Sequence, residues 1–316
     1  MNTENVQKNN PLIPVIFGPT AAGKTALAVR LAQIVGGEII SADSIQVYKE
    51  LDIGAAKPSA EELAAVRHHL VSVVECDKEF SVGEYRVLAD SAIADVVSRG
   101  NVPIICGGTG LYMQALLYGY EFAQTPRSEK TRLKYKELLE REGKESLHSL
   151  LVRLDGATAA KIHPNDTKRV IRALEIIYCS GQKKSDNIQT VKRLKYPVFI
   201  IGLDPPRDEV YERINLRVIK MFERGLLAEV KSLLTHIPPT AQSMQAIGYK
   251  ETAAYFNGLL GYDELVALVQ KNSRNYAKRQ MTFFRGQFED IHWVGSMDEA
   301  ERLLSCHCER QRSNQE

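Results

Sequence analysis

The residues with the clearest chemical potential form a glycine-bounded loop that closes on a lysine and a threonine. This loop consists of Gly18, Pro19, Thr20, Ala21, Ala22, Gly23, Lys24 and Thr25. In such a phosphate-binding loop, or P-loop, backbone N–H groups surround phosphate oxygens, and the following helix directs its positive end at them. Lys24 would add an ammonium group, and the Thr25 hydroxyl would hold Mg²⁺. The sequence therefore predicts a phosphate site, while the phosphate and the reaction stay open.

One carboxylate is expected to lie beside this loop. The apolar run 38–42 predicts a buried strand, and Asp43 follows it directly. In open α/β sheets ligands bind at the carboxyl ends of the strands, where the P-loop also lies. Asp43 is therefore either a catalytic group or a cap of the next turn, for which Ser44 is an alternative. The residues alone leave these two interpretations about even.

The elements that must position these residues alternate between strands and helices. Strands are expected at the apolar runs 13–17, 38–42, 102–106 and 197–203, with shorter ones at 70–74 and ending at Trp293. Helices are expected at 26–35, 61–69, 85–98, 111–117, 209–224, 226–234, 251–256 and 262–284. A capping box, Ser81 to Glu84, opens the third of these helices. This alternation predicts an α/β fold with a doubly wound parallel sheet.

The chain changes character between residues 120 and 196, where the apolar periods are helical. Nine basic but only three acidic residues lie between Lys161 and Lys195. Solvated helix faces usually mix the two signs, so this excess indicates a helical insertion that meets a polyanion. We therefore expect a discontinuous P-loop core at 11–119 and 197–294, a helical insertion at 120–196, and flexible tails at 1–10 and 305–316.

The overall composition is that of an ordinary globular chain of 316 residues, with 44% hydrophobic residues and a formal charge of +2. Five scattered cysteines favour a reducing compartment over a disulfide framework. Cys306 and Cys308 flank a histidine, but no second ligand pair completes a zinc site. No apolar run approaches the roughly 20 residues that span a bilayer, and the first ten residues lack an apolar signal core. The expected location is the cytoplasm.

The residues at the end of the third expected strand, 102–106, limit which reactions are possible. P-loop NTPases of the motor and switch classes place a second Mg²⁺-directing Asp at a strand end, but this strand ends in Cys106 and Gly107. Asp43 is then the one carboxylate at an early strand tip, which suits a base that activates an acceptor. Two reactions remain: phosphoryl transfer by a small-molecule kinase, and transfer with diphosphate as the leaving group.

Two helices carry further cations. Arg213 and Arg217 are four residues apart and share one helix face. The second half of helix 262–284 interleaves basic residues with Tyr276, Phe283 and Phe284, a pattern that suits RNA phosphates and bases. Taken alone, however, this pattern is better explained by a surface helix whose aromatic side chains lie in the core.

Six segments occur in an order that resembles the tRNA dimethylallyltransferase (isopentenyl-tRNA transferase) family in its bacterial form. They are GPTAAGKT (18–25), SADSIQVY (41–48), LDIGAAKP (51–58), GGTGLY (107–112), QAIGYK (245–250) and AKRQ (277–280). The resemblance extends from about Pro11 to Trp293. It is far more specific than the P-loop alone.

This resemblance implies transfer of a dimethylallyl group from dimethylallyl diphosphate to N6 of adenosine 37 of tRNA, with release of diphosphate. It implies a P-loop that holds diphosphate rather than ATP, with Mg²⁺ as cofactor. Asp43 would accept the proton of the adenine amine, which is a poor nucleophile without a base. Thr109 would contact the diphosphate or its bridging oxygen, and Arg217 would add a cation over the leaving group.

The resemblance also implies a set of RNA contacts, because the target base has to leave its stack to react. Asp43, Ser44, Ile45 and Gln46 would read the flipped adenine. The remaining RNA contacts would be Arg132, Lys168, Arg169, Val170, Ile171, Arg172, Gln245, Ala246, Ile247, Gly248, Tyr249 and Lys250. We expect a monomer. The alternatives are a P-loop nucleoside or nucleotide kinase, and a non-enzymatic RNA-binding protein with a degenerate P-loop.

Overall fold

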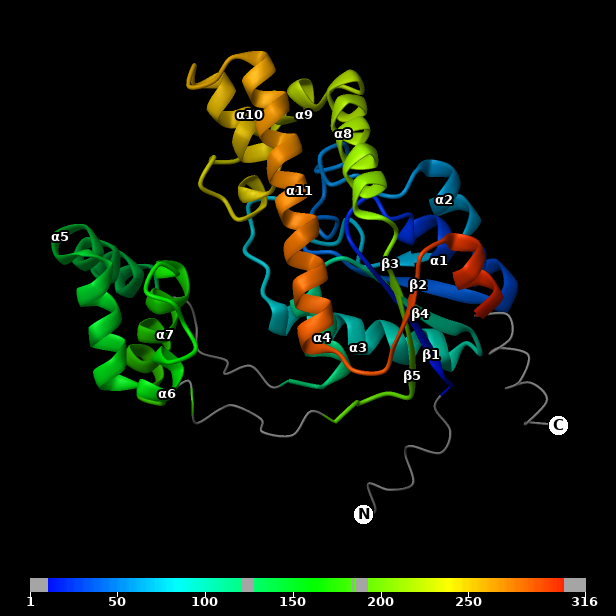
Figure 1. Ribbon diagram of the computed structural model, residues 1–316, viewed down its shortest axis with the longest axis horizontal. Coiled ribbons are helices and arrows are strands. Elements are labelled where there is room, and N and C mark those ends of the chain that lie inside the picture. The colour runs from blue at the N-terminus through cyan, green and yellow to red at the C-terminus, as the bar shows by residue number, and fades with distance from the viewer. Residues whose placement is uncertain (1–10, 121–127, 184, 186–192, 304–316) are drawn as a thin grey trace. The chain divides into compact units, whose positions relative to one another are not determined.

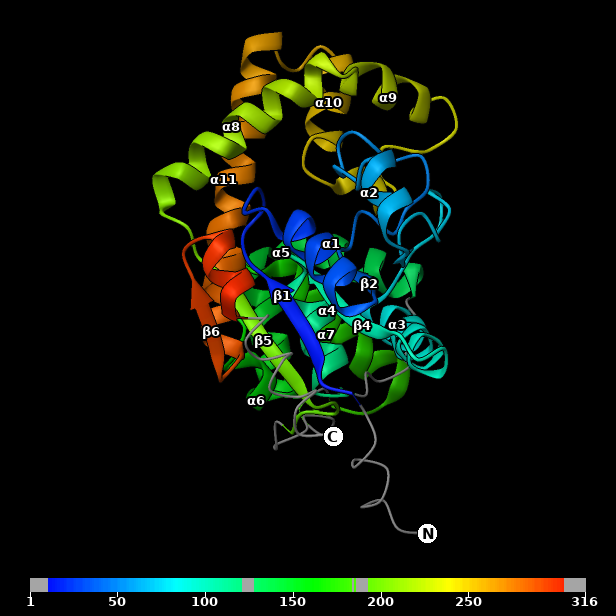
Figure 2. The ribbon, with the colours of Figure 1, turned by 90° about the vertical axis from the view of Figure 1, so that its right-hand side faces the viewer.

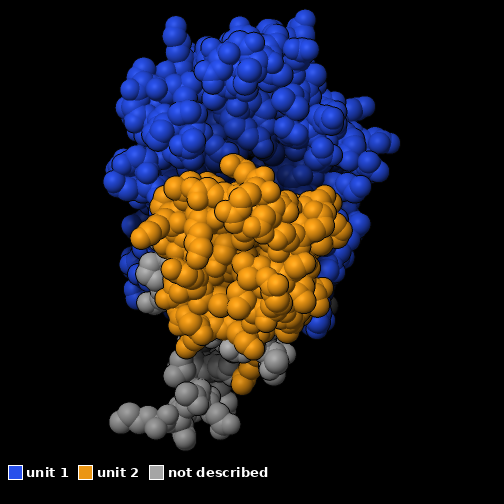
Figure 3. Space-filling view, turned by 90° about the vertical axis from the view of Figure 1, so that its left-hand side faces the viewer, with its two compact units in different colours: residues 1–119, 194–316 blue, residues 120–193 orange. Residues whose placement is uncertain are grey.

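The computed structural model describes residues 11–120, 128–183, 185 and 193–303 (Figure 1). The chain forms two compact units, coloured separately in Figure 3: residues 120–193, and the remainder. The sequence analysis ended the insertion at residue 196. Residues 194–196 belong to the larger unit, because the Lys195 N–H donates to the Leu117 carbonyl (2.7 Å) and the Tyr196 hydroxyl donates to Asp90 (2.5 Å). Both expected tails, with Cys306 and Cys308, lie outside the described residues.

The larger unit is built on a six-stranded parallel sheet of order β3-β2-β4-β1-β5-β6. The strands are β1 (Ile13–Phe17), β2 (Gly37–Ala42), β3 (His68–His69), β4 (Val102–Gly107), β5 (Val198–Leu203) and β6 (Ile291–Val294). The helices of this unit are α1 (Lys24–Val35), α2 (Ala60–Ala65), α3 (Val82–Ser98), α4 (Gly110–Leu117), α8 (Arg207–Glu223), α9 (Leu226–Leu233), α10 (Tyr249–Phe256) and α11 (Tyr262–Gln287). The predicted α/β fold with a parallel sheet is confirmed.

The strand that leads into the P-loop is the centre of the core. All five residues of β1 are buried, as expected for a strand paired on both sides. The ring of Phe17 stacks on that of Phe284, with centroids 4.1 Å apart, and Phe288 and Trp293 surround this pair. Phe284 thus has the core role that the helical pattern favoured. Helix α11 is thereby anchored to the strand that precedes the P-loop.

Helices α8, α9 and α10 and the first half of α11 group beyond the end of the sheet toward which β1 runs, and the second half of α11 continues alongside the sheet (Figure 1 and Figure 2). Helices α8, α10 and α11, the segment 245–247, and the loops that follow β1 and β2 contribute the residues of the cavity described below. None of the helices in the described ranges combines the length and hydropathy needed to cross a membrane.

The sequence prediction for residues 61–74 was wrong in its boundaries. Helix α2 ends at Ala65, and His68 and His69 form β3 by pairing with Ile39 and Ile40 of β2. The expected strand at 70–74 is absent from the described structure, because Leu70 and Ser72 have φ angles of 63° and 55°. These left-handed conformations do not occur in a regular strand. By contrast, α3 begins where the capping box predicted it.

The smaller unit contains α5 (Glu129–Leu154), α6 (Gly156–Ala159) and α7 (Thr167–Ser180). Leu147, Leu151 and Leu174 are fully buried in its own hydrophobic core. Helix α5 is interrupted at Gly143, whose φ of 82° and ψ of 172° are non-helical. Within the described residues the regular elements of this unit are all helices, in agreement with the period of its apolar residues.

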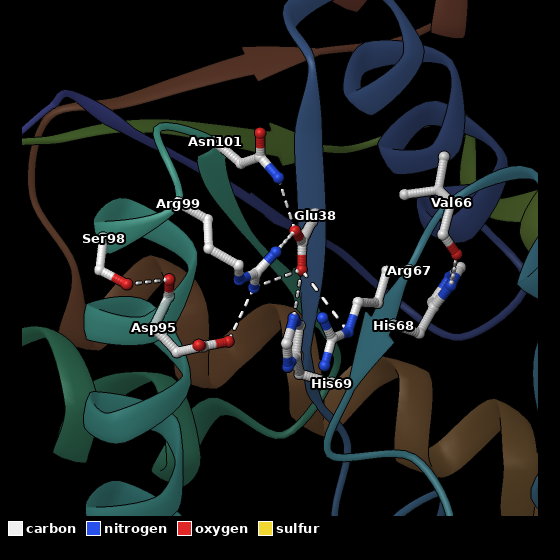
Figure 4. Close-up of polar contacts among 9 residues, drawn as sticks. All are labelled: Glu38, Val66, Arg67, His68, His69, Asp95, Ser98, Arg99 and Asn101. Atoms are coloured by element: carbon white, nitrogen blue, oxygen red, sulfur yellow. Dashed lines mark hydrogen bonds and ion pairs between the residues drawn. The ribbon is translucent and has the colours of Figure 1, made fainter.

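A buried carboxylate, Glu38 of β2, joins this strand and the edge strand β3 to the end of α3 (Figure 4). Its oxygens accept hydrogen bonds from Arg99 Nη2 (2.9 Å) and Asn101 Nδ2 (2.7 Å), and His69 Nε2 lies 2.7 Å away. Hydrogen bonding to Arg99, with smaller contributions from His69 and Asn101, lowers the pKa of Glu38 to about 2 despite its burial. Strand β3 is only two residues long and forms few backbone hydrogen bonds with β2. The charge-assisted hydrogen bonds of Glu38 therefore add to the attachment of β3 to the sheet.

We expect Glu38→Gln to destabilise the protein by about 3 kcal/mol at pH 7, because it breaks a buried ion pair. The native pKa lies below the ordinary value of 4.5, so the charge stabilises the fold above that pH, and this contribution is lost as pH falls toward 2. Urea denaturation at pH 7, 5 and 3 measures the difference from wild type, which has to shrink with acidification. The exposed Glu289→Gln is the matched control. A difference that stays constant between pH 7 and 3 contradicts the assignment.

Candidate active site

The P-loop occupies the turn between β1 and α1 and has the backbone of an anion-binding nest. Gly23 (φ 90°) and Ala21 (φ 64°) both adopt left-handed conformations. For Ala21 this conformation costs roughly 1 kcal/mol or more, and such strain is common at ligand sites. Helix α1 has no side-chain cap and no acidic residue in its first turn. Its N-terminal amide groups therefore remain available to an anion.

The side chain of Lys24 folds back over the P-loop. Its Nζ donates to the Pro19 carbonyl (2.7 Å). Burial, reinforced by the charge of Arg217, lowers the pKa of Lys24 to about 8, although Asp43 acts in the opposite direction. Lys24 is therefore a partly desolvated cation that an anionic ligand would favour in its charged form.

Gln280 of α11 holds the P-loop in place, and the sequence analysis missed this role. Its Oε1 accepts from the Thr20 N–H and its Nε2 donates to the Gly108 carbonyl, both at 2.8 Å. A Cβ at position 108 would lie 2.3 Å from Nε2, so this approach requires glycine. In the sequence, the segments GGTG (107–110) and AKRQ (277–280) both belong to the family resemblance. That resemblance indicated that both segments are functionally important, but not that they are in contact.

Asp43 is the residue whose sequence position left a catalytic role and a capping role open. Its Oδ1 accepts from the N–H groups of Ile45 (2.9 Å) and Gln46 (3.3 Å), so it does cap the following turn. The residue also lines the main cavity. No side chain or backbone group in the described ranges donates to Oδ2. One oxygen fixes the carboxylate while the other remains available to accept a proton.

Thr109 joins the end of β4 to the Asp43 turn. Its Oγ1 accepts from the Ser44 N–H (2.9 Å) and lies 3.3 Å from the Ser44 hydroxyl. Tyr276 of α11 lines the same cavity as Asp43, and burial raises the pKa of its hydroxyl to about 12. Tyr276 is thus a neutral hydroxyl in this cavity. The sequence analysis had treated it only as part of an aromatic pattern.

A cavity of about 320 Å³ opens next to these residues. Its polar end contains Thr20, Asp43, Arg217, Tyr276 and Arg279. Its apolar wall is formed by Ile214, Val218 and Met221 of α8 and by Val269 of α11. A third wall consists of Ser44, Ile45, Gly54, Ala55, Gln245, Ala246, Ile247 and Lys250. The site therefore offers cations, one carboxylate and an apolar surface in a single space.

The two arginines of α8 that the sequence placed on one helix face, Arg213 and Arg217, have different surroundings. The Arg217 Nη1 donates to the Thr20 hydroxyl (3.4 Å), and burial lowers the pKa of Arg217. Arg213 instead forms an exposed pair with Glu209 (2.9 Å), one turn earlier on α8. Arg217 alone of the two belongs to the cavity.

Three residues predicted to hold RNA in this unit lie away from the cavity lining. The Gln46 side chain contacts the Ser41 hydroxyl (3.2 Å) and donates to the Ala56 carbonyl (3.1 Å). Gly248 adopts φ 96° as the N-cap of α10. Tyr249 is fully buried, and its hydroxyl donates to Glu229 (2.7 Å). The side chain of Tyr249 is therefore structural, which corrects its assignment as an RNA contact.

The smaller unit divides its predicted RNA contacts in the same way. Val170 and Ile171 are buried in its core. Arg132 and Arg172 pair with the fully buried Glu175, with Nε–Oε1 and Nη1–Oε2 distances of 3.1 and 2.7 Å. The side chains of Val170 and Ile171 are thus unavailable to RNA, and both arginines are engaged internally. Lys168 and Arg169, in contrast, are exposed at the start of α7.

Comparison with known proteins gives consistent matches over nearly the whole chain. A family model described as IPP transferase matches residues 46–287. The tRNA dimethylallyltransferases of Bacillus subtilis and Anoxybacillus flavithermus are each 45% identical over 288 residues, covering 90% and 91% of this chain and 91% of each relative.

Solved structures agree with these sequence matches. The tRNA isopentenylpyrophosphate transferase of Bacillus halodurans superposes with a TM-score of 0.70 at 37% identity, covering 96% of this chain and 99% of that one. A eukaryotic dimethylallyltransferase, solved in a study of its action on tRNA, superposes with a TM-score of 0.74 at 30% identity, covering 91% and 75%.

We expect the affinity of the site for inorganic diphosphate to depend on the charge of Lys24. Above its pKa of about 8 the lysine has to take up a proton to bind the anion, so the advantage of wild type over Lys24→Met shrinks by up to about tenfold per pH unit. Isothermal titration calorimetry at pH 7, 8 and 9.5 measures this ratio, and the variant corrects for titration of the ligand itself. The exposed Lys220→Met is the control. A ratio that does not change with pH overturns the assignment.

Proposed function

The chain belongs to the IPP transferase family, and we propose that it transfers a dimethylallyl group from dimethylallyl diphosphate to N6 of adenosine 37 of tRNA. One observation supports this proposal: the cavity reaches the P-loop at Thr20 and is lined by cations, a single carboxylate and an apolar surface. These are the environments that a diphosphate, a nucleophile losing a proton, and a branched five-carbon group require.

The diphosphate fits the P-loop end of the cavity. Cleavage of the bond between C1 and the bridging oxygen leaves the bonding electron pair on diphosphate and raises its negative charge. Lys24, Arg217 and the amide groups at the start of α1 would stabilise this charge electrostatically. Thr109, close to Ser44 and Tyr276, is a candidate donor to the bridging oxygen.

The dimethylallyl group fits the apolar wall of α8 and α11. Ile214, Val218 and Met221 occupy one buried face of α8. An apolar surface of this kind contributes about 25 cal/mol per Å² of covered area and excludes water from an electrophilic carbon. It orients C1 between the diphosphate and the carboxylate.

The adenine amine would attack C1 from the side of Asp43. The N6–C1 bond forms as the C1–O bond breaks, and the proton lost from N6 passes to Oδ2 of Asp43. The Oδ1 atom, held by Ile45 and Gln46, keeps the carboxylate oriented during this transfer. The reaction thus conserves charge and atoms with no other reagent.

Mg²⁺ is a proposed cofactor, and its protein ligands would be few. Thr25 is a partly exposed residue in the first turn of α1. No cluster of three or more His, Cys, Asp or Glu side chains occurs in the described ranges. This sparse donor set fits Mg²⁺, which keeps several waters and binds largely through substrate phosphates. When bound, the ion would neutralise charge on the leaving diphosphate.

The helical unit is proposed to contact tRNA through Lys168 and Arg169, which lie exposed beside each other. Such side chains would bind phosphates and supply the salt-dependent part of the affinity. We further propose that the enzyme acts in the cytoplasm, where its tRNA substrate is found, and as a monomer, because one asymmetric RNA engages one site.

A direct assay separates this proposal from a nucleotide kinase. The protein is incubated with radiolabelled dimethylallyl diphosphate and unmodified tRNA, and in parallel with labelled ATP and nucleosides. We expect label to enter RNA only from the prenyl donor. Phosphorylation of a small acceptor with no prenylation of tRNA would reject the proposal. The apolar wall beside the P-loop has no purpose in that kinase reaction.

We expect Asp43→Ala to reduce the rate of transfer by at least about 10²-fold, since a positioned base contributes 10²–10⁴. Because most phosphate contacts remain, tRNA affinity should change by no more than about twofold. Single-turnover assays and filter binding measure the two quantities. The exposed Asp208→Ala on α8 serves as the control. Near-wild-type turnover of Asp43→Ala would remove Asp43 from the role of base.

We expect the double change Lys168→Ala and Arg169→Ala to weaken tRNA binding and to lower the slope of log K against log salt by about 2, one unit for each lost phosphate contact. Binding is measured between 50 and 300 mM KCl. A double change of the exposed Lys220 and Lys231 removes the same charge from the larger unit. An unaltered slope for the first variant would exclude this part of α7 from the RNA interface.

A further inference from the structure

Glu229 of α9 is bound by three consecutive backbone amides. The N–H groups of Asp52 and Ile53 donate to Oε2 (3.1 and 2.7 Å), and that of Gly54 donates to Oε1 (3.1 Å). Oε1 also accepts from the Tyr249 hydroxyl (2.7 Å). One carboxylate from the helical layer thus captures the loop that follows the Asp43 turn. Four donors on a single carboxylate are more than helix packing requires.

Tyr249 completes this arrangement, which we call the loop clamp (Glu229 and Tyr249 with residues 52–55). The Tyr249 hydroxyl donates to Glu229 and accepts from the Ala55 N–H (3.1 Å). Its ring lies so close to Gly54 that a Cβ there would be 2.3 Å from a ring carbon. Burial, aided by the charge of Glu229, raises the pKa of Tyr249, so the hydroxyl keeps its proton. All polar groups of the clamp are matched.

The clamped loop is part of the reaction cavity. Gly54 and Ala55 line it, together with Ala246 and Ile247. The next residue, Ala56, accepts from the Gln46 side chain (3.1 Å), and the Gln46 N–H in turn donates to Asp43 (3.3 Å). Hydrogen bonds, linked by the backbone of residues 53–56 and by the Gln46 residue itself, therefore connect Glu229 to the carboxylate of Asp43.

We propose that Glu229, with Tyr249, is a positioning residue for the acceptor base: it fixes loop 52–55 as the wall against which the adenine is held next to Asp43. This inference rests on the proposed function. The diphosphate lies at the P-loop end, so it does not depend on this wall. Loss of the clamp should therefore misplace the acceptor while leaving the donor in place.

The geometry predicts how variants rank. Glu229→Ala removes all four acceptor contacts. Glu229→Gln keeps one acceptor oxygen but turns an NH₂ group toward an existing donor, either the Ile53 amide or the Tyr249 hydroxyl. Tyr249→Phe keeps the three amide contacts of Glu229 and loses the hydroxyl that donates to Glu229 and accepts from the Ala55 N–H. The effect should decrease in that order.

The test compares these variants with the exposed Glu223→Gln of α8 in prenyl transfer to tRNA. We expect kcat to fall by about 10²-fold in Glu229→Ala, the size of effect that small misplacements cause. The KM for dimethylallyl diphosphate and the Kd of inorganic diphosphate should remain within twofold. Hydrogen exchange at the amides of residues 52–55 should accelerate. Tyr249→Phe carries the test if Glu229→Ala does not fold.

Two outcomes would overturn the inference. Faster exchange at residues 52–55 with kcat and the KM for tRNA unchanged would make the clamp purely structural. An equal loss of diphosphate affinity would mean that the clamp supports the whole site. If wild-type protein transfers nothing to tRNA, the proposed function fails, and that result is distinct from both.

Discussion

The site depends on a single buried amide, that of Gln280, which the N–H of the P-loop and the carbonyl of Gly108 hold from two directions. A strained nest has to be supported by its surroundings, because Ala21 and Gly23 adopt conformations that an unsupported loop would leave. The Phe17–Phe284 stack fixes α11 one turn farther along and so fixes the position of this amide. The packing of the core therefore also holds the P-loop in its conformation.

At Asp43 one carboxylate caps a turn with Oδ1, and under the proposed function it would also act as the base with Oδ2. Because Oδ1 accepts from two backbone N–H groups of the turn, these bonds also orient the Asp43 carboxylate. The capping also places Ser44 against Thr109, so the ends of β2 and β4 are joined by a hydrogen bond of 2.9 Å. Strand β4 ends in Gly107, which packs against Ala42: a Cβ at position 107 would lie 2.2 Å from the Ala42 carbonyl oxygen. An acidic side chain at position 107 would therefore clash with β2.

The sequence was a good guide where local rules decide the structure. The P-loop, the capping box of α3 and the buried runs of β1, β4 and β5 were all located, because spacing and burial determine them. It failed at residues 66–74, where two left-handed residues and pairing with β2 override helical periodicity. It also failed to identify Gln280 and Glu229, whose partners are 260 and about 175 residues away in the chain. Polar contacts of such long range have no periodic signature.

Under the proposed function, the charges at the P-loop end would favour diphosphate as a leaving group. Burial lowers the pKa values of both Lys24 and Arg217, so holding these cations without an anion is unfavourable. Neither forms an ion pair with any carboxylate in the described part of the chain; each has only a neutral oxygen partner, Pro19 or Thr20. A diphosphate relieves this cost on binding, and it does so further as C–O cleavage adds negative charge. Interactions that strengthen during bond breaking are the ones that accelerate a reaction. The nest is therefore better matched to the departing diphosphate than to the intact donor.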